Sequence, residues 1–367
     1  MTAPASAPIV IQPPRAAART PSQGAPAAAC EILPACLYSE WDRFVDASPH
    51  GTIFHFSWWL AVTAQSFRLL VVRDEHSRII AGIPLPEKAG AGFRLLHSPV
   101  LTPYLGPIFD LSGVEGTCEQ LRVMRHYGEL LARNLGPFDS FSCISGAAGP
   151  DLQGFLWAGF QVCLAYTFRF DACRNVVDIQ KGMTRTHAQK LSKAKRLNLQ
   201  VERDSSVEVL LTLNKRSFAR KGTAPPYGDE IVNRLWTAAS QRGLADTYRA
   251  STAEGRPIAA LLTVHDSRTT YQIVSGFDPE SLDLPGQNSL LWAAAVDALT
   301  AGRHFDFEGS SIRGVETFYR RWGATAAPVW KLQKYGSLRG RLVGLAMNYR
   351  DARKRASGSS IPKGTDR

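Results

Sequence analysis

The chain has 367 residues, of which 44% are hydrophobic and 20% are charged, and this composition is that of a globular protein with room for two domains. No apolar run approaches the roughly 20 residues that a membrane-spanning helix needs. The first 20 residues lack the charged and apolar regions of a secretory signal. The six cysteines form no CxxC pair, and no His pair has metal-ligand spacing. We therefore expect a cytoplasmic protein with reduced thiols and no metal site.

The net charge of +11 is concentrated near the C-terminus. Residues 331–367 hold ten Lys/Arg and two Asp, and residues 1–29 add two Arg, whereas 30–330 carry 31 basic and 30 acidic residues. The body is therefore nearly neutral. Only the basic tail favours a polyanionic partner, which would be RNA, phospholipid or a nucleotide-linked substrate, and we expect no DNA partner.

The first half of the chain alternates apolar strands with amphipathic helices. Polar residues 74–77 separate two apolar runs and indicate a hairpin. The expected elements are, in chain order, helices at 37–46 and from 57, the two hairpin strands, a helix at about 116–135, a strand at 138–145, a helix ended by Gly159 and a strand at 161–172.

The second half repeats this pattern and ends in a distinctive stretch. A loop with Pro and Gly leads into an apolar helix, Ser289 to Ala301, and a short strand, HFDFEG, follows Gly302. The other expected elements are a helix at 183–197 with a strand after it, helices ended by Gly222 and Gly243, three strands between 245 and 278, and an aromatic and arginine-rich turn that ends at Gly323.

Four segments together resemble the Fem-type branch of the GNAT superfamily of acyltransferases. They are HFSWWLAV at 55–62, SPVLTPYLGPIF at 98–109, THAQKLSKAKRLNLQVE at 186–202 and FDFEGSSIRGVETFYRRWGA at 305–324. The last segment is the strongest match. The resemblance implies an α+β fold of two tandem GNAT-like domains, each a mixed, mostly antiparallel sheet flanked by helices, plus a C-terminal helix.

On this basis we expect five parts along the chain. An Ala/Pro-rich disordered tail at 1–29 precedes a first GNAT-like domain at 30–177, on the acceptor side. A second GNAT-like domain at 178–335 holds the acyl donor. A basic amphipathic helix at 336–356 packs on the first domain or rests on anionic lipid at the inner face of the membrane. Residues 357–367 are expected to be disordered.

The loop before the apolar helix is the expected donor-binding segment. Free N–H groups and the helix dipole make a helix N-terminus a natural phosphate site. The alternative is a plain N-cap by Asn288 or Ser289, with a glycine for the turn. The expected donor-binding residues are Gly286, Gln287, Asn288 and Ser289.

The short strand HFDFEG supplies the expected catalytic carboxyl groups. Period-two geometry places Asp306 and Glu308 on one face, where either could accept the proton of an attacking amine. The alternative is a solvated strand end. Tyr319 is expected to donate to the developing oxyanion, and its alternative is a packing role.

The substrate is expected to be held by arginines and by a tyrosine of the first domain. Arg313 and Arg320 could grip a phosphate or carboxylate, and Tyr104 lies in a rigid Pro/Gly segment where it could contact substrate. The alternatives are surface arginines and a core tyrosine. The basic helix at 183–197 is either a solvated face or a contact for donor phosphates or for a tRNA acceptor stem.

The resemblance implies an N-acyltransferase that moves an acyl group to an amine by direct attack in a ternary complex. Fem-type enzymes usually carry Phe-Lys where this chain has Phe318-Tyr319. With that Lys absent, acyl-CoA is the expected co-substrate, with no permanently bound cofactor, and aminoacyl-tRNA is the alternative. The acceptor is a small-molecule or cell-envelope-precursor amine. A non-catalytic binding protein of an envelope polysaccharide pathway is the third hypothesis.

Overall fold

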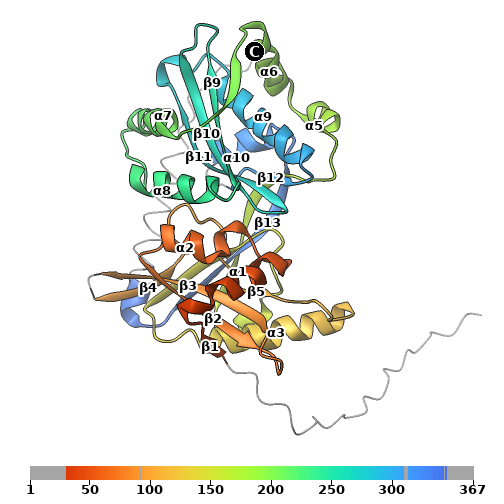
Figure 1. The fold of residues 1–367 in the computed structure, drawn as a ribbon, viewed down its shortest axis with the longest axis vertical. Helices are drawn as coiled ribbons and strands as arrows, with labels where there is room; N and C mark the ends of the chain where they lie inside the picture. The colour runs from red at the N-terminus through yellow and green to blue at the C-terminus, as the bar shows by residue number, and fades with distance from the viewer. Residues whose placement is uncertain (1–29, 91, 310–312, 343, 345–367) are drawn as a thin grey trace, which may run out of the picture.

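The computed structural model describes residues 30–90, 92–309, 313–342 and 344, which form two lobes joined by long strands (Figure 1). The tails expected at 1–29 and 357–367 lie outside the described residues. Most of the helix expected at 336–356 also lies outside them, although 338–342 is helical. No helix in the described part of the chain is long and apolar enough to cross a membrane.

The first lobe contains the elements expected from its hairpin and helix patterns. It consists of β1 (Cys30–Ile32), α1 (Tyr38–Ala47), α2 (Ser57–Thr63), β2 (Ser66–Arg73), β3 (Ile79–Gly90), β4 (Phe93–His97), β5 (Ile108–Phe109), α3 (Thr117–Arg133), β6 (Ser140–Ser145), α4 (Gln153–Trp157) and β7 (Gln161–Phe170), with short 3-10 turns at Ala35–Leu37 and Ile53–His55.

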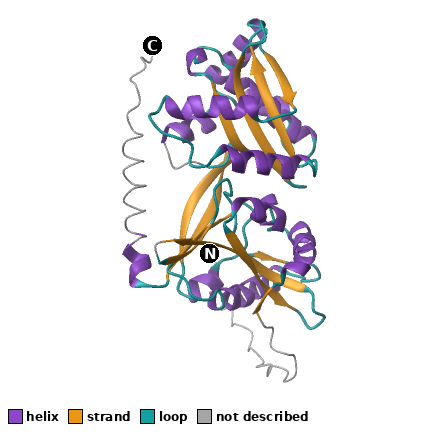
Figure 2. Cartoon of the chain, turned by 60° about the vertical axis from the view of Figure 1, so that its left-hand side comes forward, coloured by secondary structure: helices purple, strands orange, loops and turns teal. Residues whose placement is uncertain are grey.

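The second lobe follows with helices on both sides of a sheet (Figure 2). It consists of α5 (Val176–Gly182), α6 (Arg185–Arg196), β8 (Gln200–Asp204), α7 (Glu208–Ala219), α8 (Asp229–Ser240), β9 (Ala245–Ser251), β10 (Pro257–His265), β11 (Thr269–Phe277), α9 (Gly286–Thr300), β12 (His304–Asp306), α10 (Arg313–Arg320) and β13 (Thr325–Tyr335), with a 3-10 turn at Pro279–Ser281.

The two lobes exchange strands through β7 and β13. The sheet runs β1-β2-β3-β4-β6-β13-β7-β12-β11-β10-β9-β8, with β5 paired to β3. The end of β13 pairs with β6 of the first lobe, from Trp330 to Tyr335. The end of β7 pairs with β12 of the second lobe, where Phe170 lies opposite Phe305. Each lobe therefore contains a strand from the other half of the sequence, and the boundary expected at 177/178 stays a prediction.

The sheet of the second lobe is covered on both faces. On β10, Ala259 and Leu261 pack in the core cluster that contains α9. The alternating residues Ala260 and Leu262 pack with α7. Because successive side chains of a strand point to opposite faces, α7 and α9 cover opposite faces of this sheet. This explains why β10 reads as a continuous apolar run.

Two predicted boundaries shift near the expected site. The apolar helix begins at Gly286 rather than at Ser289. The strand expected over HFDFEG ends at Asp306, two residues before Glu308. Both shifts change the local geometry of residues proposed to act on substrate.

Candidate functional site

The site lies where two parallel strands separate. β11 and β12 pair at three positions, which end with Tyr271 opposite Asp306. Beyond them β11 continues to Phe277, whereas β12 has ended. Asp306 therefore stands at the point where the two strands diverge, and the Phe307 N–H that follows it donates to the Phe168 carbonyl oxygen of β7 at 2.9 Å.

Asp306 is a buried carboxylate with donors from both halves of the chain. Its side chain is 2% exposed. The Thr167 hydroxyl donates to Oδ1 at 2.6 Å, and the Glu308 backbone N–H donates to the same atom at 2.8 Å. The Tyr104 hydroxyl lies 3.3 Å from both carboxylate oxygens. Burial raises the pKa of Asp306 to about 6, although these hydrogen bonds favour its ionised form.

Glu308 is close to Asp306, but not for the reason that the sequence suggested. The residue has a φ of +53°, which no regular strand adopts, so the period-two argument was wrong at this position. A turn around the Asp306 carboxylate brings Glu308 back instead. Burial, followed by the charge of Asp306, raises the pKa of Glu308 well above its usual range. Glu308 Oε1 is buried and has no hydrogen-bond partner among the described residues.

Tyr319 on α10 faces the same carboxyl groups. It is 8% exposed and packs against Phe307 at 5.1 Å between ring centroids. Burial raises the pKa of Tyr319, and the charge of Glu308 raises it further, which places the two side chains near one another. A hydrogen bond with the Gln272 side chain on β11 lowers the pKa of Tyr319 and so offsets part of this rise. Gln272 Oε1 itself is a buried acceptor without a partner in the described part of the chain.

A cavity borders Asp306 on the side of the first lobe. This cavity of about 120 Å³ is lined by Tyr104, Tyr271 and Asp306, together with Arg169 and Arg268. Tyr104 borders this cavity but is only 4% exposed. Because its hydroxyl donates to the Asp306 carboxylate, it also positions that group. The lining places cationic guanidinium groups beside an acidic one. Such a cavity suits a small group that carries both charges.

The N-terminus of α9 borders a larger cavity of about 390 Å³. Gly286, Gln287 and Asn288 line it, together with Lys190 and Lys193 of α6. The first N–H groups of a helix have no acceptor within the helix. The N-cap residue is Pro285, and no side chain caps this end. The plain N-cap alternative was therefore wrong.

Two residues of the expected donor segment do not behave as a simple phosphate loop. Ser289 lines a different cavity, and its hydroxyl donates to the Pro285 carbonyl oxygen at 3.0 Å. A Cβ on Gly286 would lie 2.8 Å from Cδ1 of Ile258, so a larger residue here would force the Ile258 side chain to move. Asn288 is 4% exposed, and its Nδ2 has no partner among the described residues.

One of the two expected arginines, Arg320, has a partner on its own helix. Arg320 is exposed, and its Nε pairs with Glu316 at 2.8 Å on the surface of α10. This contact does not test whether Arg320 binds substrate, so that role stays a prediction. Arg313 begins α10, but its side chain lies outside the described residues.

Sequence reasoning missed the residues that complete the site from distant strands. These are Thr167 on β7 and Tyr271 and Gln272 on β11. The β-branched and aromatic residues of TTYQIVSGF were a signal for a strand, but they did not show what the strand faces. No signal for Thr167 was present, because its role depends on the pairing of β7 with β12.

Comparison with known proteins assigns the fold. Residues 180–320 match the family model of the acetyltransferase (GNAT) domain. The chain is similar to the crystal structure of FemX, with a TM-score of 0.62 and 13% sequence identity over 86% of this chain and 99% of that one. It is also similar to a conserved protein of unknown function from Bacteroides thetaiotaomicron VPI-5482, with a TM-score of 0.53 and 9% identity over 83% of this chain and 99% of that one. No curated protein sequence matches the chain.

The chain therefore has a GNAT, Fem-like fold, with a GNAT domain in its second half. The domain match supports an acyltransferase. The predicted α+β class with a mixed, mostly antiparallel sheet is confirmed.

Proposed function

We propose that the protein transfers an acyl group from acyl-CoA to an amine by direct attack in a ternary complex. The observation that carries this proposal is the buried carboxyl pair at the divergence of β11 and β12. Glu308 Oε1 and Gln272 Oε1 are buried acceptors with no partner in the described part of the chain. A buried hydrogen-bond acceptor without a donor destabilises the fold. The ammonium or amine group of the substrate would donate hydrogen bonds to these two oxygens.

In this proposal the acceptor nitrogen attacks the thioester carbonyl carbon. Glu308 takes the proton that the nitrogen loses, and the CoA thiolate leaves as the amide bond forms. Tyr319 donates its O–H to the oxygen on which negative charge develops. Asp306 holds the Glu308 backbone through the 2.8 Å hydrogen bond and raises the basicity of the Glu308 carboxylate by its own charge.

The donor is proposed to enter at the N-terminus of α9. The uncapped N–H groups there suit a pyrophosphate. Lys190 is partly desolvated, which lowers its pKa, and Lys193 Nζ donates to the Asp283 carbonyl oxygen at 2.7 Å, so it also holds the loop. The unpartnered Nδ2 of buried Asn288 is a further donor for a phosphate oxygen.

The acceptor is proposed to come from the opposite side, through the cavity that Asp306 shares with Arg169 and Arg268. The guanidinium groups suit an acidic group on the acceptor. An aminoacyl-tRNA donor remains the second candidate, because α6 carries basic residues beside the donor cavity.

A thermal-shift comparison of acyl-CoA with charged tRNA tests the donor. At a hundredfold excess over its dissociation constant, the true donor should stabilise the protein by about 2.7 kcal/mol. Lys190→Gln should weaken acyl-CoA binding by about 10- to 150-fold, since hydrogen bonds to charged groups contribute about 1.5–3 kcal/mol. Arg185→Gln, on the same helix but outside the donor cavity, is the matched control. Stabilisation by charged tRNA alone would reassign the donor.

Turnover of Glu308→Gln tests the chemistry. Loss of a general base should lower the rate by on the order of a hundredfold. The wild-type rate should rise with pH, because Glu308 has a raised pKa and must be ionised to accept a proton. A variant that keeps both the wild-type rate and its pH profile would remove Glu308 from the mechanism.

A further inference from the structure

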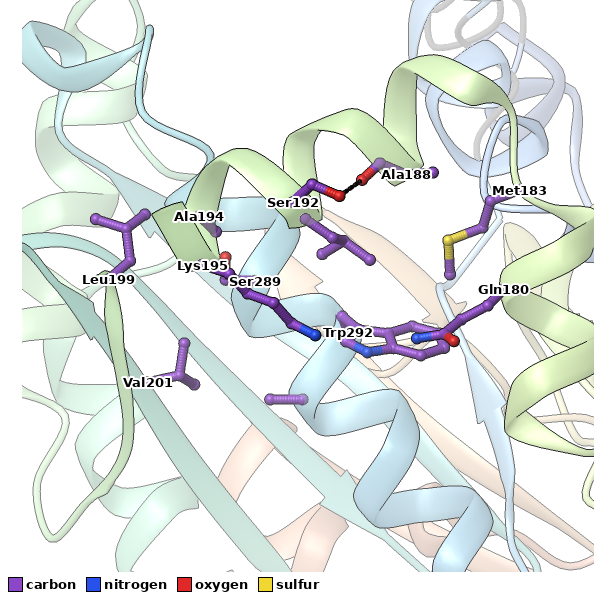
Figure 3. A pocket seen from close by; sticks show the side chains of 12 residues that line it. Gln180, Met183, Ala188, Ser192, Ala194, Lys195, Leu199, Val201, Ser289 and Trp292 are labelled. Atoms are coloured by element: carbon purple, nitrogen blue, oxygen red, sulfur yellow. Dashed lines mark hydrogen bonds between the residues drawn. The ribbon is translucent and has the colours of Figure 1, made fainter. Parts of the chain in front are cut away.

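A cavity of about 480 Å³ lies between α6, α9 and the start of β8 (Figure 3). None of the carboxyl-site residues lines it, and it differs from the cavity at the N-terminus of α9. Its volume lies within the range of small-molecule sites. The lining residues are Gln180, Met183, Ala188, Leu191, Ser192, Ala194, Lys195, Leu199, Val201, Ser289, Trp292 and Ala293.

Most of this lining is aliphatic. One aromatic residue, Trp292, lines the cavity, and its ring stacks on Trp322 with 6.3 Å between centroids and 7° between planes. This contact fixes the indole as a firm wall. The hydroxyl groups of Ser192 and Ser289 donate to the carbonyl oxygens of their own helices, so they offer little to a polar ligand. An extended apolar chain fits this lining better than a nucleotide base, which needs several hydrogen-bond partners.

The polar end of the cavity is cationic. Figure 3 shows Lys195 and Gln180 reaching toward Trp292 from opposite sides. Among the residues that the structure describes, no carboxylate lines the cavity. The basic side chains of α6 form no ion pair with the described residues, so the helix presents uncompensated positive charge beside the opening. These side chains are Arg185, Lys190, Lys193, Lys195 and Arg196.

We propose that this cavity binds an acyl chain of medium length that ends in an anionic group. The chain lies along Leu191, Leu199 and Val201, and the anionic group meets the Lys195 ammonium. Charge complementarity selects the head group, and apolar burial provides most of the binding free energy. The site does not depend on the proposed transferase reaction, because none of its residues lines the cavity proposed for the donor or belongs to the carboxyl pair.

Isothermal titration calorimetry of the full chain with four ten-carbon probes tests the head group. Decanoate and decyl phosphate should bind at one molecule per chain, and the stronger of the two identifies a carboxylate or a phosphate head. Decanol should bind about fivefold more weakly than decanoate, and decylammonium more weakly still, because exposed ion pairs contribute up to about fivefold in affinity. No binding of either anion, or equal binding of all four probes, would overturn the proposal.

Three variants locate the binding. Ala188→Phe fills the cavity from an exposed helix position and should weaken decanoate binding at least about tenfold. Lys195→Gln should weaken it up to about fivefold. Arg196→Gln removes the neighbouring charge, which lines no part of the cavity, and should leave binding unchanged. Unchanged affinity in Ala188→Phe, or equal losses in the two charge variants, would refute this location. The thermal shift with acyl-CoA should persist in Ala188→Phe, which separates this site from the donor site.

Discussion

Replacing Asp306 by Asn should change the free energy of unfolding in a pH-dependent way. The variant should gain stability over wild type as the pH rises from acid to neutral. The pKa of Asp306 is raised from its ordinary value of 3.8 to about 6 by burial. In wild type the folded state therefore holds a proton more tightly than the unfolded state between about pH 4 and pH 6. Asp306 therefore contributes fully to the stability of the folded state below about pH 4, and this contribution is lost as the pH rises through about 6. Asn carries no such proton.

The size of the effect follows from the same values. A change from 3.8 to about 6 corresponds to about 3 kcal/mol. The advantage of Asp306→Asn over wild type should grow by about this amount from pH 4 to pH 7. The hydrogen bonds from Thr167 and from the Glu308 N–H can persist on the amide oxygen. Removing the Asp306 charge also lowers the pKa of Glu308 in the folded state, and this further increases the stability of the variant relative to wild type at neutral pH.

Urea unfolding followed by circular dichroism at several pH values measures this difference. Subtracting wild type from the variant cancels the titration of other carboxyl groups. Asp178→Asn is the control, because that carboxylate is exposed and lies 3.7 Å from Lys181 Nζ. A stability difference that stays flat between pH 4 and pH 7 would refute the claim that Asp306 is buried at an ionic cost.

Three further predictions follow from the same geometry. Gly286→Ala should lower the free energy of unfolding by about 1–3 kcal/mol, because its Cβ would lie 2.8 Å from Ile258 Cδ1; an unchanged denaturation midpoint would contradict this. Tyr319→Phe should lower turnover by on the order of a hundredfold with little change in stability, and normal turnover would assign Tyr319 to packing alone. Deleting 350–367, the basic end of the chain, should flatten the salt dependence of binding to RNA or anionic vesicles, whereas an unchanged slope would point to the basic face of α6.

The sequence predicted much of the fold because its signals are local. Glycines such as Gly222 and Gly243 adopt positive φ just after helices, where the pattern placed helix ends. The short separation of Asp306 from Tyr319 also made their grouping predictable. In contrast, Tyr104 and Thr167 lie 202 and 139 residues away from Asp306. No local pattern indicates a contact at such separation.

The exchange of β7 and β13 was hidden for the same reason. An alternating strand shows which of its faces is buried, but it does not show which neighbour it pairs with. The error at Glu308 had a different origin. Its positive φ arises because the Asp306 side chain captures the Glu308 N–H, and a turn made by a buried carboxylate cannot be read from periodicity.

The carboxyl pair is best understood as an arrangement that a ligand completes. Burial raises the pKa of both Asp306 and Glu308, and the charge of Asp306 raises the pKa of Glu308 further. Asp306 receives donors from Thr167 and Tyr104, yet Glu308 Oε1 receives none among the described residues. A cationic or hydrogen-bonding group that reaches both carboxyl groups would relieve both costs at once. The proposed amine substrate carries that charge and those protons, so in this proposal the feature that destabilises the fold also favours binding of the amine.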